Sequence, residues 1–313
     1  MRNVQTIGSR RGPRYLLKRL CKSWQLYLLI LPATLYFAIF HFWPIYGLQI
    51  AFRTYKAKLG ILGSPWVGFE HFTRFLTGPN FVNLVTNTLR ISLGNLLLGF
   101  PIPILLALVL NEIRSRPYKR LVQTVSYAPH FISLVVMVSM LRIFLNVNAG
   151  IINKLIGLFG AGPFDFLSKG SWFASIYVIS SIWQSAGWGS IIYLAALSGV
   201  DASQTEAAMV DGASRLQRIW HINLPAILPT VIIMFILDSG KIMSVGYEKA
   251  YLMQTPLNLQ YSEIISTYVY KVGLLNAQYS FSAAVGLFNS VINLILLLSV
   301  NAISRRVSST GLL

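Results

Sequence analysis

Residues whose side chains could carry out chemistry are scarce in this chain of 313 residues, which has nine Asp and Glu, four His and one Cys. They form no G-x-x-x-x-G-K-S/T phosphate loop, no H-E-x-x-H zinc motif and no G-x-S-x-G nucleophile turn. The one cysteine, Cys21, excludes an intrachain disulfide and a metal cage built from cysteines. We therefore expect no catalytic residue, no metal site and no cofactor in this chain.

Pro129 and His130 stand side by side within an otherwise apolar segment. A proline inside a membrane helix frees backbone carbonyl groups, which must find other donors because the bilayer core holds no water. We therefore expect His130 to donate to the carbonyl groups of a kink and not to act in catalysis.

The densest group of polar and small residues is the stretch 201–225, which reads DASQTEAAMVDGASRLQRIWHINLP. Ser203 followed three residues later by Glu206 has the spacing of a capping box, which predicts the start of a helix. Gly212 permits a sharp turn after that helix, since glycine adopts backbone conformations that other residues avoid.

A second helix is predicted in the same stretch, from an N-cap at Ser214 through Gln217 to Ile222. Leu224-Pro225 closes it, because proline suits the first turn of a new helix. Two short helices joined at a glycine between apolar segments predict a surface that another protein binds.

The segments around this stretch are apolar: 55% of all residues are hydrophobic, 11% are charged and the mean hydropathy is +0.61. Soluble domains have about 25% charged residues, so the composition predicts an integral membrane protein. The formal net charge of +17 could indicate a nucleic-acid partner. Most cations flank apolar segments, where they set orientation in the membrane, so we expect no nucleic-acid binding.

Six apolar segments approach the roughly 20 residues that a bilayer core requires. They predict an all-α polytopic membrane protein with about six transmembrane helices. Pro101 and Pro103 are expected to kink the second segment, and Pro129 lies inside the third. The six segments are residues 25–45, 87–110, 121–145, 171–197, 226–243 and 280–303.

Basic residues are dense in the segments on one side of these spans, with seven in residues 1–23, four in 111–120, two in 201–225 and two near the C-terminus. Ten others are spread over the longer loops of the opposite side. Because cytoplasmic loops are rich in Lys and Arg, both termini and the stretch 201–225 are predicted to be cytoplasmic.

The predicted organisation has four parts. A basic cytoplasmic N-tail is followed by the first transmembrane helix with its outward-facing loop, by a five-helix core that contains 201–225, and by a C-tail. Residues 13–22 form either a short interfacial helix or part of a disordered basic tail. The four parts are residues 1–23, 24–86, 87–304 and 305–313.

The stretch 201–225 also carries a resemblance, through Glu206-Ala207-Ala208, Asp211-Gly212-Ala213 and Ile222-Asn223-Leu224-Pro225. In type and spacing these groups resemble the EAA motif of permeases of binding-protein-dependent ABC importers. A hydrophobic position that the family often fills with Phe is Ile219 here, a mild departure. The layout from residue 87 to the C-terminus is similar to the core of that family, which implies the type I ABC importer fold.

A narrower resemblance covers residues 44–72, most specifically LGSPWVGFEHF, and the group Gly150-Ile151-Ile152-Asn153. These segments resemble the multiple-sugar permeases of the LplB-like and alginate-importer kind. That group implies an oligosaccharide as the transported solute, with an acidic, alginate-like sugar as one candidate.

The family resemblance implies a complete assembly around this chain. A second permease, expected to be a paralogue, would complete the pathway, two separate ATPase subunits would use ATP and Mg, and an extracytoplasmic binding protein would deliver the solute. Glu206 would face a basic residue of the ATPase. An ordinary cytoplasmic loop is the alternative interpretation. The implied coupling residues are Glu206, Ala207, Ala208, Asp211, Gly212, Ala213 and Ser214.

The substrate pathway is predicted from polar and aromatic residues inside the spans, because sugars are bound by hydrogen bonds and by stacking. Asp238 and Lys241 are three residues apart on one helical face, where they can pair. Contacts between helices or interfacial anchoring are the alternative roles for all of these residues. The candidates are Trp183, Gln184, Trp188, Asp238, Lys241, Asn289 and Asn293.

Cations on the predicted outer side would favour an acidic oligosaccharide. The alternatives are contacts with a binding protein or with lipid headgroups. These cations are Arg53, Lys56, Lys58, Lys241 and Lys249.

The function predicted from the sequence is that of a transmembrane permease subunit in a bacterial plasma membrane, which imports an oligosaccharide with the help of separate ATPase chains. A permease for another solute, such as glycerol phosphate, is the alternative within the class. An ion-driven secondary transporter is disfavoured, because it predicts an inverted repeat and acidic residues at the membrane midplane. Most of the nine acidic residues here lie in loops.

Overall fold

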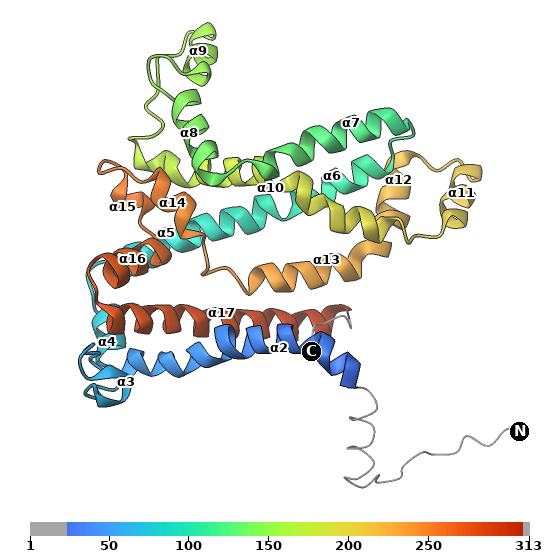
Figure 1. The fold of residues 1–313 in the computed structure, drawn as a ribbon. Helices are drawn as coiled ribbons and strands as arrows, with labels where there is room; N and C mark the ends of the chain where they lie inside the picture. Colours follow the sequence, from blue (N-terminus) through green and yellow to red (C-terminus); the bar gives the residue numbers. More distant parts are fainter. Residues whose placement is uncertain (1–23, 309–313) are drawn as a thin grey trace, which may run out of the picture.

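The computed structural model describes residues 24–308, which fold into helices (Figure 1). Within these residues no strand forms, and the only β-bridges pair Arg53 with Trp66 and Lys56 with Gly60. The predicted N-tail, including the interfacial helix considered for residues 13–22, lies outside the described residues. The all-α fold expected from the sequence is confirmed.

Four continuous helices are long and apolar enough to cross a membrane, and each is longer than the segment predicted for it. They are Trp24–Phe52, Phe81–Asn111, Arg215–Ser239 and Tyr279–Arg306. Their parts are α2 (Trp24–Phe37), η1 (Ala38–Phe42), η2 (Trp43–Phe52), α5 (Phe81–Gly94), η3 (Asn95–Gly99), α6 (Pro101–Asn111), α12 (Arg215–Arg218), η6 (Ile219–Asn223), α13 (Leu224–Ser239) and α17 (Tyr279–Ser308).

The third predicted span is bent and not straight. It consists of α7 (Arg116–Tyr127) with η4 (Ala128–Phe131), followed after a break by α8 (Leu134–Phe144). The two halves are bent by 101°. Pro129 lies at the start of η4, where the missing N–H group ends the regular hydrogen bonding of α7.

The fourth predicted span is α10 (Phe173–Leu197), which has 25 residues. It is long enough to cross a membrane, but serines and Gln184 make it too polar to qualify by composition. The predicted count of six spans therefore includes the bent pair α7–α8 and this polar helix.

Pro44, Pro101 and Pro225 lie within long helices and do not end them. A proline lacks the amide N–H and clashes with the carbonyl four residues earlier. The residue four positions before Pro44, Pro101 and Pro225 is the central residue of the π-helical turns η1, η3 and η6. A π turn is wider than an α turn, so it accommodates the proline ring. The predicted end of the second coupling helix at Leu224-Pro225 is therefore wrong, because that helix continues into α13.

The remaining helices are short and lie at the two ends of the bundle (Figure 1). The start of α2, the connection from α6 to α7, α11 and α12, and the end of α17 share one end. The two ends match the two groups of loops that the charge pattern distinguished. The short helices are α3 (Gly60–Gly63), α4 (Glu70–Leu76), α9 (Ile151–Leu158), η5 (Gly170–Trp172), α11 (Ala202–Val210), α14 (Tyr247–Met253), α15 (Leu259–Ser262), α16 (Ile265–Tyr270) and η7 (Lys271–Leu275).

The centre of the bundle is α10, which packs against α5, α6, α7 and α13. Three clusters of buried apolar side chains lie between the helices of the bundle. One of them joins α6, α10 and α13 through Ala107, Tyr193 and Ile227. The polar helix α10 is therefore surrounded by other helices of the chain.

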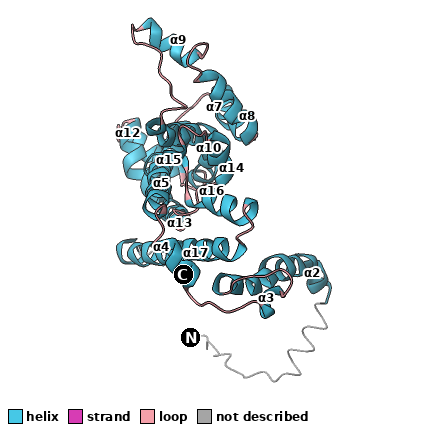
Figure 2. Ribbon diagram, turned by 90° about the vertical axis from the view of Figure 1, so that its left-hand side faces the viewer, coloured by secondary structure: helices cyan, strands magenta, loops and turns pink. Residues whose placement is uncertain are grey.

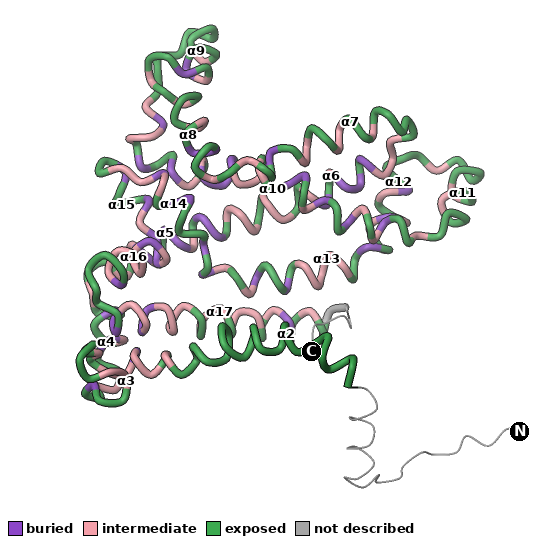
Figure 3. The backbone as a smooth tube through the Cα atoms, viewed as in Figure 1, coloured by how far each residue is buried: buried purple, intermediate pink, exposed green. Residues whose placement is uncertain are grey.

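The first span has few partners among the residues that the structure describes. None of the residues of α2 is buried (Figure 3). Its continuation η2 packs on α17, whereas Figure 2 shows α2 and α3 set apart from the rest of the bundle. The apolar surface of α2 is left to lipid or to another chain.

Candidate coupling surface and translocation cavity

The first helix of the stretch 201–225, α11, is capped differently from the prediction. The side chain of Asp201 accepts a hydrogen bond from the backbone N–H of Ser203, at 2.9 Å. Asp201 is therefore the N-cap, and the predicted capping box of Ser203 with Glu206 is wrong. Asp is as strong an N-cap as Ser and stands two residues earlier. The same hydrogen bond holds the pKa of the Asp201 carboxyl below its usual value.

The end of α11 is a turn that requires glycine. Gly212 has a φ of +79°, in the left-handed region. The N–H of Ala213 donates to the carbonyl of Ala208 at 2.8 Å, and the N–H of Gly212 donates to that of Met209 at 3.2 Å. These two bonds form a Schellman motif, which satisfies the last carbonyl groups of a helix. The sharp turn expected at Gly212 is confirmed.

The second helix starts at the predicted residue. Ser214 accepts from the N–H of Gln217, and the Gln217 side chain accepts from the N–H of Ser214 at 2.7 Å. This reciprocal pair is a capping box. It fixes the direction of α12 immediately after the glycine turn.

The two helices present both polar and apolar side chains to the outside. Glu206, Ala207, Asp211, Gly212 and Ser214 are exposed, and Ala208 and Ala213 are half-buried. Three large apolar side chains, Val210, Leu216 and Trp220, are also exposed, Val210 to 88%. Exposed apolar groups rimmed by polar residues mark a surface that binds another protein. Contact of the predicted coupling residues with an ATPase stays a prediction.

A buried ion pair, which the sequence reasoning missed, holds this surface against α6. Arg218 donates to Glu112 at 2.7 Å, with side-chain exposures of 8% and 14%. Arg218 also donates to the carbonyl of Ala213 at 3.0 Å, and Asn223 donates to Glu112 at 3.2 Å. The available signal was Glu112 itself, an acidic residue beside a strongly basic segment. The coupling helices are therefore tied to the end of α6.

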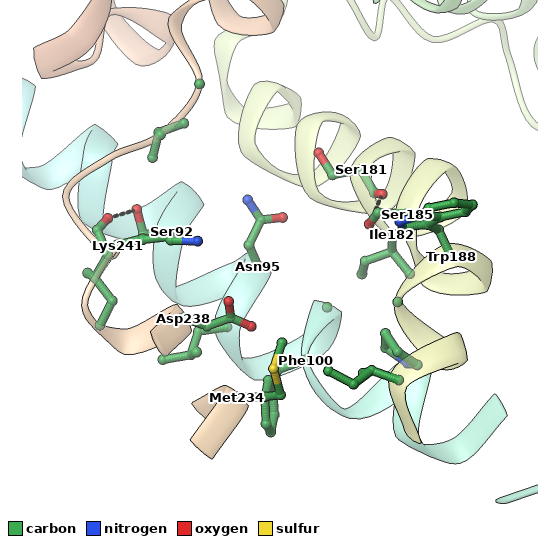
Figure 4. Close-up of a pocket in the computed structure, with 18 of the residues that line it drawn as sticks. Ser92, Asn95, Phe100, Ser181, Ile182, Ser185, Trp188, Met234, Asp238 and Lys241 are labelled. Carbon is green, nitrogen blue, oxygen red and sulfur yellow. Dashed lines mark hydrogen bonds between the residues drawn. The ribbon is translucent and has the colours of Figure 1, made fainter. Parts of the chain in front are cut away.

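A cavity of about 760 Å³ lies between η3, α10, α13 and the segment that follows α13 (Figure 4). Asn95 and Asp238 project into this space from η3 and α13. The hydroxyl of Ser92 donates to the carbonyl of Ile242 at its edge. Its polar lining residues include Ser92, Asn95, Ser181, Ser185, Asp238 and Lys241.

Of the predicted pathway residues, the structure brings three to this cavity: Trp188, Asp238 and Lys241. Asp238 and Lys241 do not form the predicted ion pair, because α13 ends at Ser239 and the helical spacing is lost beyond it. The ion pairs among residues 24–308 are Arg218–Glu112 and Lys271–Glu263.

The other predicted pathway residues lie elsewhere. Trp183 lines neither this cavity nor its neighbour. Asn293 accepts from the N–H of Met243 at 2.9 Å, and Asn289 donates to the carbonyl of Met243 at 3.0 Å. The two asparagines thus fix the segment after α13 against α17, which is the alternative role that the sequence left open. Substrate contact by these three residues stays a prediction.

Gln184 performs the role that was expected of His130. Its amide donates to the carbonyl of Ile132 at 2.8 Å, in the break between α7 and α8. His130 instead stacks on Trp188, with ring centroids 4.6 Å apart and an angle of 3°. The expectation that His130 satisfies the carbonyl groups of the kink is therefore not met. A glutamine reaches the carbonyl because it projects from the neighbouring helix α10.

The serines of α10 at the cavity were also missed by the sequence reasoning. Ser181, Ser185 and Trp188 are spaced four and three residues apart, so they share one helical face. Ser92 and Asn95 show the same spacing of three before the first proline of their span. Helical periodicity of the polar residues was the signal that could have found this lining.

Comparison with known proteins places this chain in a family. The family model described as "binding-protein-dependent transport system inner membrane component" matches residues 99–309. The chain belongs to this family. It is a multi-pass permease subunit of the inner membrane and is not itself an enzyme.

Two relatives from Bacillus subtilis (strain 168) are similar over nearly the whole chain. Protein LplB is 46% identical and the polygalacturonan/rhamnogalacturonan transport system permease protein YteP is 45% identical. The alignments cover 92% and 95% of this chain and 90% and 92% of those proteins. The narrower resemblance to LplB-like permeases is confirmed.

A solved structure shows the same fold. It is a chain of a bacterial alginate ABC transporter, crystallised in complex with a periplasmic protein that holds an alginate pentasaccharide. The TM-score is 0.87 and the identity 39%, over 95% of this chain and 99% of that one.

Proposed function

We propose that this chain is a permease subunit of an ATP-driven ABC importer that takes up an acidic oligosaccharide, one built from uronate units. An extracytoplasmic binding protein delivers the oligosaccharide, and two separate ATPase subunits supply the energy from ATP and Mg. The observation that carries the proposal is the cavity at the centre of the bundle, which combines the volume of a ligand site with hydroxyl, amide, indole, carboxylate and ammonium groups.

The size and lining of the cavity suit a sugar. Ligand sites have volumes of about 300–1,000 Å³ and a few polar groups among apolar walls, and this cavity has about 760 Å³. Asn95, Ser181 and Ser185 offer donors and acceptors for sugar hydroxyls, and Trp188 offers a ring for stacking. The cavity also holds one charge of each sign, the ammonium group of Lys241 and the carboxylate of Asp238, which do not pair with each other. The names of YteP and of the solved alginate transporter mention acidic polysaccharides.

The coupling role of the stretch 201–225 rests on three features. The two helices lie at one end of the bundle and expose apolar side chains, and the Arg218–Glu112 pair ties them to α6. A movement of α11 and α12 is therefore transmitted to α6, which belongs to a span that lines the cavity. Glu206 is exposed on this surface, so its carboxylate is free to meet a basic residue of the ATPase.

A second permease, a paralogue of this chain, completes the pathway. Among residues 24–308, no other segment buries the apolar side chains of α2, which leaves this helix available to a partner permease. The end of the bundle that carries α11, α12 and the terminal part of α17 faces the cytoplasm, in agreement with the density of Lys and Arg there.

Uptake by the whole importer tests the proposal. The complex is reconstituted in vesicles with its ATPase subunits and binding protein, and labelled oligosaccharides of equal length are compared. A galacturonate trisaccharide is expected to be taken up in an ATP-dependent manner and faster than a neutral trisaccharide. Faster uptake of the neutral sugar, or of glycerol phosphate, would refute the acidic substrate.

A further inference from the structure

The structure separates the five outward cations into groups with different surroundings. Arg53 donates to the carbonyl groups of Leu62 and Ser64, at 2.9 and 2.8 Å, and so holds its own loop together. Lys56 and Lys58 are exposed. Lys241 lines the large cavity. Lys249, on α14, is different, because it is the one that is buried, with 4% of its surface exposed.

The buried ammonium group of Lys249 has hydrogen-bond partners but no counter-ion among residues 24–308. It donates to the carbonyl of Tyr177 at 3.0 Å and to the hydroxyl of Ser181 at 2.6 Å. It also lies 4.5 Å from the centre of the Tyr177 ring. In the described part of the chain no carboxylate lies within 4.0 Å of it. Its neighbour Glu248 is exposed and lines the same cavity as Lys249 without pairing with it.

Lys249 lies in the wall of a second cavity, of about 460 Å³. Tyr177, Ser181 and Ser185 line both this cavity and the large one. The two residues that hold the ammonium group therefore belong to the boundary between the cavities. A ligand group that moves along α10 from one cavity to the other passes Lys249.

Burial of a cation without a counter-ion is costly, and the cost points to a ligand. An ammonium group has three donors, and two protein acceptors are present for Lys249. Removal of water lowers the pKa of Lys249 to about 7. An incoming carboxylate reverses this effect, because an opposite charge within about 4–6 Å favours the charged form. The site is therefore better matched to a ligand that carries a carboxylate than to a neutral one.

We propose that Lys249 binds the carboxylate of a uronate unit as the oligosaccharide passes from one cavity to the other. The inference rests on the proposed function, since it assigns a residue to the recognition of the acidic substrate. Lys249 then determines specificity within the permease, in addition to the selection made by the binding protein. A purely structural Lys249, which only ties α14 to α10, would affect acidic and neutral substrates equally.

The test compares two substrates in one preparation of the reconstituted importer. They are a galacturonate trisaccharide and its carboxyl-reduced, neutral counterpart, each at a concentration that saturates the same binding protein. In Lys249→Met, uptake of the acidic trisaccharide is expected to fall about tenfold or more, and that of the neutral one less than about twofold. Lys249→Arg keeps the positive charge and is expected to keep the preference for the acidic substrate.

The control is Lys154→Met, which removes an exposed lysine of α9 away from both cavities. It is expected to leave the ratio of the two uptake rates unchanged. A defect in folding or assembly lowers both rates together and leaves the ratio intact. The rates are therefore compared in Lys249→Met complexes of verified assembly, where an equal loss for both substrates, or no loss, overturns the role of Lys249. If the unaltered importer fails to take up the acidic trisaccharide, the proposed function itself is wrong.

Discussion

In the stretch 201–225, the structure is determined by residues that are close in the sequence. Asp201 and Ser214 cap the two helices, and Gly212 forms the turn between them, each through backbone groups nearby. The cavity is assembled differently. Its polar lining comes from α5, η3, α10, α13 and the segment after α13. The first region is determined by local sequence, and the second exists only once distant helices have packed.

This difference has consequences for what a substitution does. A change on the exposed face of α11 is expected to affect a partner and not the fold. A change in the polar contacts around the cavity affects the fold, the substrate or both, depending on whether the side chain faces the backbone or the open space. The variants below separate these cases, in order of decreasing expected effect.

The largest effect is expected for Glu206→Lys, which reverses the charge at the centre of the proposed ATPase contact. A like-charge contact costs several kcal/mol, so at least about tenfold less ATPase is expected to copurify with the permease. The amount of permease in the membrane should stay the same, because Glu206 is exposed. Gln204→Lys, two residues away on another face of α11, is the matched control. Full retention of the ATPase by the Glu206→Lys variant would refute the coupling role of Glu206.

The next effect is expected at the ion pair behind that surface. Glu112→Gln leaves the guanidinium of Arg218 buried without its counter-ion. Breaking a buried pair costs about 3–5 kcal/mol, so the Tm of the purified permease should fall clearly. The double variant Glu112→Leu with Arg218→Met should recover most of the loss, because it buries no charge. Additive losses in the double variant would show that the two side chains do not act as a pair.

The Arg218–Glu112 ion pair could not be predicted from the sequence, whereas parts of the coupling helices could. The turn at Gly212 and the cap at Ser214 were predicted because both depend on backbone groups within three or four residues. Glu112 and Arg218 are 106 residues apart and meet only after α6 and α12 pack. A pattern among neighbouring residues cannot predict a contact between residues so far apart in the sequence. The same limit explains the predicted pathway residues, of which the packing brings Trp188, Asp238 and Lys241 to the large cavity and leaves Trp183, Asn289 and Asn293 outside it.

A proline caused one of the other errors. Pro225 was interpreted as the end of one helix and the start of another, because a proline in an α-helix interior is normally disruptive. The π turn η6 accommodates Pro225, so the second coupling helix, α12, and α13 form one continuous helix. The helix-start prediction at Ser203 failed for a milder reason: two good N-cap residues, Asp201 and Ser203, stood close together, and the earlier one was used.

A smaller loss is expected for Asn293→Ala, which removes a partner of the backbone of Met243. The N–H of Met243 is then left without its acceptor, and an unsatisfied buried donor costs about 1–3 kcal/mol. The free energy of unfolding should fall by that amount. The ratio of acidic to neutral oligosaccharide uptake should stay constant, because Asn293 fixes a segment and does not line the cavity. A changed ratio of acidic to neutral uptake, with unchanged stability, would indicate that Asn293 contacts the substrate.

Gly212→Ala is expected to cost about 1–2 kcal/mol, the price of placing a side chain in the left-handed region. The added methyl group meets no atom within 4 Å, so strain at the φ of +79° is the only source of the loss. Gly157→Ala, inside α9, also adds a methyl group in open space but without positive φ, and should not destabilise the protein. An equally mild result for both variants would mean that the turn does not need glycine.

The smallest change in stability is expected for Asn95→Ala, and this variant decides whether the cavity is a passage. Asn95 projects into the cavity from η3 (Figure 4), so its loss removes a possible partner of a sugar hydroxyl and leaves the helix contacts in place. One hydrogen bond contributes about 1 kcal/mol, which corresponds to a several-fold decrease in uptake with Tm nearly unchanged. Asn95 and Asn293 are then opposite cases, one altering transport without stability and the other stability without specificity. If Asn95→Ala lowers Tm as much as Asn293→Ala and leaves uptake intact, the polar lining serves packing, and the substrate must cross the membrane elsewhere.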